Sequence, residues 1–129
     1  MRRVLIPLIA AAITLMSWHA DAQISKPEVR DAIHKLKSPN PEEVLMSVQV
    51  LAASGSKEAV GPLTDLLRSG PRNDITNSII QALGSIGQKS SVAILIEYLE
   101  HRRPDARVAA IYALEALTDP RITDALENR

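Results

Sequence analysis

The chain has 129 residues with 15 basic and 15 acidic side chains, so its formal net charge is zero. That balance supplies no long-range attraction to nucleic acid or to an anionic membrane surface. The sequence contains no cysteine, which excludes disulfides, thiolate catalysis and cysteine-based zinc sites. It also contains no Phe and few other aromatic residues, so a core of Ala, Leu, Ile and Val is expected, which suits stacked helices better than a sheet.

Residues 1–22 have the three-part pattern of a secretory signal peptide. Met1-Arg2-Arg3 is a basic start, residues 4–16 form an uncharged apolar run, and Ala20-Asp21-Ala22 fits an A-x-A cleavage site. The run is shorter than the ~20 residues that a spanning helix needs, although an uncleaved anchor or a helix of the domain are the alternatives. The pattern predicts a mature chain from Gln23, exported to the periplasm or medium of a bacterium, with no stable membrane insertion after cleavage.

Internal repetition organises the rest of the chain. Three segments with apolar side chains at helical spacing can be laid over one another: 41–55, 74–87 and 105–118. In this alignment Leu51, Leu83 and Leu114 fall in register, at steps of 32 and 31 residues. The first two segments end in Gly55 and Gly87, residues that favour the left-handed stop of a helix.

A second amphipathic helix is expected after each of these segments, at residues 57–69, 89–101 and 121–128. Residues 26–37 carry the same second-helix pattern, which predicts an additional helix that caps the N-terminal end of the fold. Pro62 falls in the first turns of its helix and is expected to start that helix late or to kink it.

Two antiparallel helices for every ~31 residues are typical of an α-solenoid, in which each pair needs its neighbour to bury its apolar stripe. The sequence therefore predicts an all-α fold. We expect residues 23–129 to form a short right-handed α-solenoid of about three helix pairs behind the capping helix. A helical bundle without repeats is the alternative.

The third segment carries a family resemblance. Residues 104–114 read Pro-Asp-Ala-Arg-Val-Ala-Ala-Ile-Tyr-Ala-Leu, which resembles the first helix of a HEAT or HEAT-like (phycobilisome-lyase-type) repeat. Asp74 and Ala82-Leu83-Gly84 repeat part of that pattern. The resemblance implies a curved surface, lined by the second helices, that binds protein or another ligand. Thr76 stands where Arg107 stands in the third segment, which departs from the Asp–Arg ladder that such repeats often form.

The sequence shows little sign of catalytic or cofactor chemistry. His34 and His101 lie on separate helices without metal-ligand spacing, so solvated histidines are favoured over a zinc site. Residues 84–87 lack the spacing of a phosphate-binding loop. The basic residues at 101–103 and Arg107 could contact an anion, but cations also suit the C-terminal end of a helix. No cofactor, metal or nucleic acid partner is therefore expected.

The polar faces of the second helices are the candidate partner-binding surface. Six residues are predicted to contribute to it: His34, Asp65, Arg68, Glu97, Glu100 and His101. An ordinary solvated face with weak ion pairs is the alternative interpretation.

These observations predict an exported, non-catalytic interaction module that presents a rigid surface to a protein partner. The sequence specifies neither the identity of that partner nor the oligomeric state of this chain. Two other functions are consistent with the sequence. One is an accessory to an enzyme or to a chromophore-attachment system, and the other is an assembly fragment that is stable only when it is docked.

Overall fold

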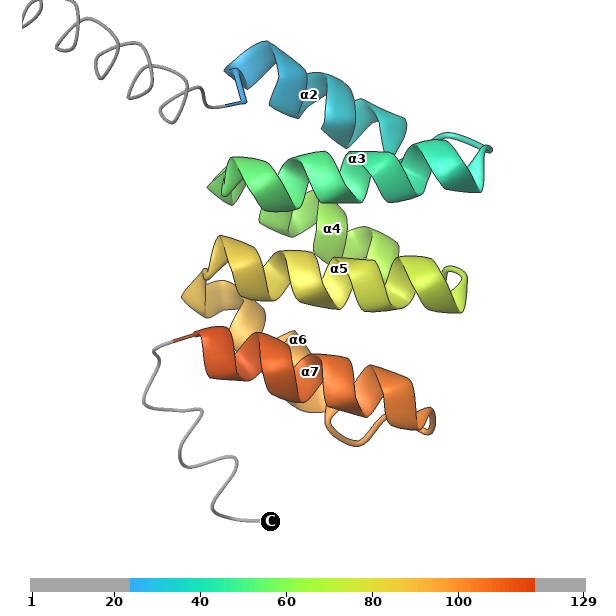
Figure 1. The fold of residues 1–129 in the computed structure, drawn as a ribbon, viewed down its shortest axis with the longest axis vertical. Helices are drawn as coiled ribbons and strands as arrows, with labels where there is room; N and C mark the ends of the chain where they lie inside the picture. Colours follow the sequence, from blue (N-terminus) through green and yellow to red (C-terminus); the bar gives the residue numbers. More distant parts are fainter. Residues whose placement is uncertain (1–23, 118–129) are drawn as a thin grey trace, which may run out of the picture.

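A computed structural model describes residues 24–117 as a stack of helices (Figure 1). The helices in chain order are α2 (Lys26–Lys35), α3 (Pro41–Ser54), α4 (Val60–Arg68), α5 (Asn73–Ile86), α6 (Val92–Tyr98) and α7 (Pro104–Ala116). Two 3₁₀ turns, η1 (Lys57–Ala59) and η2 (Lys89–Ser91), lead into α4 and α6. No strand occurs in the described part of the chain, so the all-α prediction is confirmed. The predicted signal peptide and the helix expected at 121–128 lie outside the described residues.

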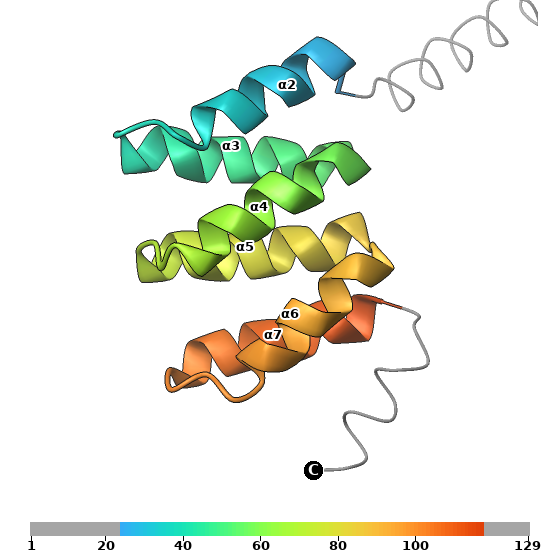
Figure 2. The same ribbon diagram turned by 180° about the vertical axis from the view of Figure 1, so that it is seen from behind.

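The helices form two layers. The first helices of the repeats, α3, α5 and α7, lie side by side in one layer, and α4 and α6 lie behind them (Figures 1 and 2). Helix α5 packs against both α3 and α7, while α4 packs on α5 and α6 packs on α7. Helix α2 packs on α3 in the same way, at the N-terminal end of the stack. This arrangement confirms a short helical-repeat solenoid.

The leucine register predicted from the sequence is confirmed. Leu51, Leu83 and Leu114 are all completely buried, each on the first helix of its repeat. The second helices add further fully buried leucines, including Leu63 and Leu95. All of these side chains belong to one hydrophobic core that runs along the stack, and burying each leucine contributes roughly 1.5–3 kcal/mol.

Local signals in the sequence set the helix ends. Gly55 and Gly87 end α3 and α5 in the left-handed conformation, with φ of 63° and 73°. Asn40 begins α3, because its side-chain oxygen accepts a hydrogen bond from the backbone N–H of Glu42 at 3.0 Å. These ends keep the first helices equal in length within a residue, so they stack along their whole length.

The second helices are shorter than the sequence predicts. Helices spanning 57–69 and 89–101 were expected, but the α-helical parts cover only Val60–Arg68 and Val92–Tyr98, each entered through a 3₁₀ turn. Pro62 has no N–H to donate, so it fits only in a first turn, and α4 begins two residues before it. After Tyr98 the chain continues in a 3₁₀-like turn, in which the backbone N–H of His101 donates a hydrogen bond to the oxygen of Tyr98 at 3.2 Å.

Candidate functional site

The predicted partner-binding residues lie on α2, α4 and α6 and in the turn after α6, on the second-helix side of the stack (Figure 2). Five of them are exposed to solvent: His34, Asp65, Arg68, Glu97 and Glu100. The sixth, His101, is half-buried. Together these six residues form what we call the second-helix surface.

Tyr98 sits at the centre of one part of the second-helix surface. Its hydroxyl donates a hydrogen bond to the backbone oxygen of Leu67 at 3.4 Å, which joins α6 to α4. Its ring stacks on the ring of His101, with centroids 5.1 Å apart and an interplanar angle of 2°. Tyr98 is not among the residues predicted for this surface, although its spacing of three residues from His101 indicates that the two rings share one side of a helix.

Charged side chains of two repeats influence the hydroxyl of Tyr98. Burial raises the pKa of the Tyr98 hydroxyl, while the nearby positive charge of Arg68 acts to lower it and the negative charge of Glu97 acts to raise it. Tyr98 therefore contacts His101 and α4 directly and lies within electrostatic range of Arg68 and Glu97. His34 lies apart from this group, in a hollow of about 370 Å³ that it shares with Asp31 and Lys37.

The basic cluster after α6 is engaged in holding the turn into α7. Arg107 donates hydrogen bonds to the backbone oxygens of His101 at 2.8 Å and Arg102 at 3.2 Å. The guanidinium of Arg103 pairs with Asp105 at 2.9 Å. Arg107 thus satisfies carbonyl groups beyond the end of α6, as the helix-end interpretation of these cations expects.

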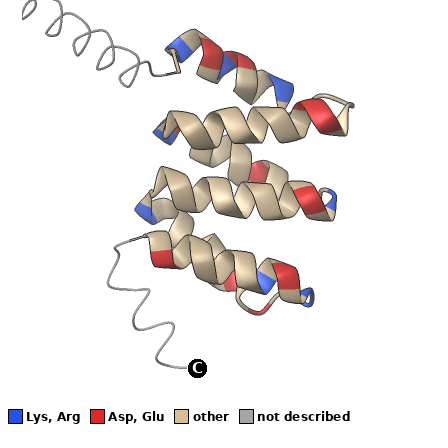
Figure 3. Cartoon of the chain, viewed as in Figure 1, with Lys and Arg blue, Asp and Glu red and all other residues tan. Residues whose placement is uncertain are grey.

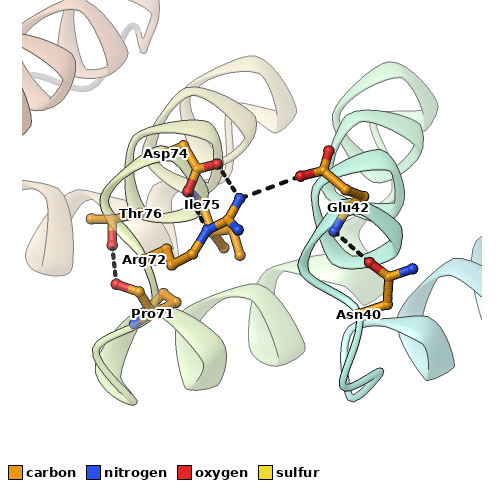
Figure 4. Close-up of polar contacts among 7 residues, drawn as sticks. All are labelled: Asn40, Glu42, Pro71, Arg72, Asp74, Ile75 and Thr76. Carbon is orange, nitrogen blue, oxygen red and sulfur yellow. Dashed lines mark hydrogen bonds and ion pairs between the residues drawn. The ribbon is translucent and has the colours of Figure 1, made fainter.

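Polar contacts of another kind join neighbouring first helices. Arg72, in the loop before α5, pairs with Asp74 at 2.6 Å and reaches Glu42 of α3 at 3.6 Å (Figure 4). The side chain of Asn77 donates to Asp105 of α7 at 2.9 Å. The Arg72 hydrogen bond lowers the pKa of Asp74, and the Asn77 hydrogen bond lowers the pKa of Asp105. These contacts link adjacent repeats in a chain where Thr76 replaces the arginine of the third segment.

A groove runs between α2 and α3 at the N-terminal end of the stack, with a volume of about 580 Å³. Its apolar lining comes from Ile24, Ala32, Met46 and Val50. Charged residues border it: Glu28, Asp31, Lys35, Glu42 and Glu43. Sequence reasoning missed this groove, because Met46 and Val50 belong to the helical apolar pattern that was assigned to the core.

Two negative observations apply to residues 24–117. No group of three or more His, Asp or Glu side chains is placed to hold a metal ion there. No helix in that range is long and apolar enough to cross a membrane.

The repeated packing of α3, α5 and α7 is the geometry expected of HEAT-like repeats. Residues 74–129 match the family model of HEAT repeats. The match starts in α5 and supports a HEAT-like repeat protein. In the structure the same packing extends to α3 and α2, ahead of the matched residues. A comparison with curated proteins finds no match.

Proposed function

We propose that this chain is an exported HEAT-like interaction module, which binds a protein partner through its second-helix surface and carries out no catalysis. The observation that carries the proposal is the cluster of Arg68, Glu97 and His101 around Tyr98, which spans two repeats. The matched HEAT repeats support it further, because such repeats typically mediate protein interactions.

The chemistry of this cluster suits a protein surface. Arg68 and Glu97 offer opposite charges to solvent, beside the stacked rings of Tyr98 and His101. Arginine and tyrosine are, with tryptophan, the residue types that are enriched among those that dominate the binding energy of protein interfaces. We infer a partner that presents a polar surface with charges of both signs.

The contacts between repeats support a surface that is already ordered before binding. Tyr98 fixes α6 to α4, and Asn77 fixes α5 to α7. A surface held in this way loses little conformational freedom when a partner binds, and that loss is one of the main costs of association. Export is supported by the signal-peptide pattern of residues 1–22.

The test is capture of a partner from the native cell envelope with the tagged protein and with an R68E/E97K variant. The wild-type chain should retain one protein in a fixed ratio, and the variant should lose it. Both residues are exposed, so the variant's stability should change by no more than ~0.5 kcal/mol per substitution.

Glu115→Lys is the matched control, since Glu115 is also exposed but lies on α7 in the first-helix layer. Loss of the partner with Glu115→Lys, and retention with R68E/E97K, would move the working surface to the opposite side. Failure of the wild-type chain to retain any protein would overturn the proposal.

A further inference from the structure

Helix α3 exposes a face that the corresponding helices α5 and α7 bury. In the leucine register Met46 corresponds to Ser78 and Ala109, and Val50 corresponds to Ala82 and Ala113. The three alanines are between 1% and 8% exposed, whereas Met46 is 66% and Val50 is 36% exposed. Ala113 of α7 packs directly against α5 at Gly84, so this is the face that each first helix turns toward the one before it. On α3 that face has no first helix to meet among the described residues.

We propose that the groove between α2 and α3 binds one amphipathic helix of a partner protein, in the place of a preceding first helix. The groove holds about 580 Å³, and its lining on α3 runs from Glu42 to Val50, which is roughly 12 Å of helix and fits about two turns of a bound helix. The apolar part of its lining is accessible to solvent, and Met46 is the most exposed side chain there. The site is separate from the second-helix surface, so the two proposals can fail independently.

The charged residues at the border of the groove indicate which charge the bound partner helix should carry. Four carboxylates line it, from Glu28, Asp31, Glu42 and Glu43, against the single ammonium of Lys35. That ammonium is 2.7 Å from Asp31, and the guanidinium of Arg72 is 3.6 Å from Glu42, so two of the four carboxylates are partly offset and the border stays acidic. A helix with Lys or Arg beside its apolar stripe complements this border, and a helix with acidic flanks is repelled by it. The middle of the first-helix layer, in contrast, is largely uncharged (Figure 3).

The packing between α5 and α7 indicates what the helix must carry opposite Val50. Gly84 is the residue that meets Ala113, and a Cβ at Gly84 would lie 2.7 Å from the Ala113 Cα. Val50 stands in the position of Ala113 and is larger. A small residue on the bound helix is therefore expected opposite Val50, because a large side chain would hold the two helices further apart than α5 and α7.

A second copy of this chain is a poorer occupant than a foreign helix. If α7 of another copy entered the groove, the residue in the position of Gly84 would be Glu115, and its carboxylate would face Val50. Covering a carboxylate with an apolar side chain carries a large desolvation cost. Two grooves meeting face to face would instead bring their acidic borders together.

The test uses a fluorescently labelled peptide of about 18 residues with a stripe of Ala and Leu flanked by Lys, and a twin with Glu at every Lys position. Fluorescence anisotropy with the purified exported protein should show saturable binding of the Lys peptide. The Glu peptide should bind about tenfold or more weakly, and added salt should weaken the Lys peptide.

Met46→Lys should reduce the affinity for the Lys peptide by about tenfold or more. Tyr112→Lys is the matched control, because Tyr112 is also 66% exposed but lies on α7, and it should leave the affinity unchanged. R68E/E97K should likewise leave it unchanged, which separates this site from the second-helix surface. Melting curves of each variant show that the fold is intact.

Four outcomes would overturn the proposal. The first is no saturable binding, and the second is binding that Met46→Lys does not alter. The third is a dimer in analytical ultracentrifugation that Met46→Lys dissociates, since a second copy would then fill the groove. The fourth is an exported protein that keeps residues 1–22 and binds the peptide only after their removal, which would assign the groove to that segment.

Discussion

Ala113 of α7 lies so close to Gly84 of α5 that a Cβ on Gly84 would come within 2.7 Å of the Ala113 Cα. The atom in the way belongs to the backbone, so no rotation of a side chain can relieve the contact. We expect Gly84→Ala to destabilise the protein by about 1–3 kcal/mol, through overpacking between the two helices. Urea unfolding measures the change, which should appear even though alanine favours a helix over glycine by up to ~1 kcal/mol.

The control for this prediction is Ser85→Ala, the next residue of α5, which is exposed. Its effect should stay within ~0.5 kcal/mol. Equal losses at the two positions would contradict the close contact as the cause, because Ser85 does not share it.

Leu83→Ala tests the core of the central repeat. Leu83 is completely buried on α5, the helix that packs on both α3 and α7. Removing its branched side chain should cost about 2–5 kcal/mol, from lost burial and from the cavity that remains. In a fold of this size such a loss is a large part of the total stability. A melting temperature that does not change would contradict the register that aligns the repeats.

Asp105 should make the stability depend on pH. The hydrogen bond from Asn77 lowers the pKa of Asp105 below its ordinary value of 3.8. A carboxyl with a lowered pKa in the folded state stabilises the fold above its ordinary pKa, and this contribution is lost as pH falls through the folded pKa. Asp105→Asn should therefore flatten the fall in melting temperature between about pH 5 and pH 3.

Glu115→Gln removes another carboxylate from the same helix and serves as the comparison for Asp105→Asn. If it flattens the acid limb to the same extent, the effect belongs to the net charge of α7 and not to the contact with Asn77.

The processing prediction concerns residues outside the described range. Cleavage after Ala22 should leave Gln23 as the first residue of the exported protein. Trp18 is the only tryptophan, so the processed chain should show no tryptophan fluorescence. Edman sequencing or intact mass decides the point, and an exported chain that starts at Met1 would contradict the prediction.

Most of the fold could be predicted from local patterns. The leucine register follows from the spacing of apolar residues, and Gly55 and Gly87 mark helix ends by a backbone property of the residue itself. Both signals depend only on near neighbours in the sequence. The lengths of α4 and α6 were predicted less well, because the periodicity of apolar residues does not distinguish an α-helix from the 3₁₀ turn that precedes it.

The sites were harder to predict, because they depend on which faces remain uncovered. Met46 and Val50 repeat at four-residue spacing, as Val44 and Val48 do, yet Met46 is 66% exposed and Val48 is 1% exposed. The two pairs lie on different faces of α3, and the face of Met46 meets no preceding first helix among residues 24–117. Likewise, the sequence places Arg107 near the end of the preceding helix, but residue spacing does not identify the backbone oxygens of His101 and Arg102 as its acceptors.

The end-to-end order of the stack has a consequence for amide hydrogen exchange. Helix α5 is held by α3, α4 and α7, so its amides should be the last to exchange, while opening begins at the ends of the stack. A ligand that binds only the folded state raises protection in the segments whose opening releases it. A helix bound beside Met46 should slow exchange chiefly in α2 and α3. A partner on the second-helix surface should instead slow exchange in α4 and α6, so one exchange map would distinguish the two surfaces.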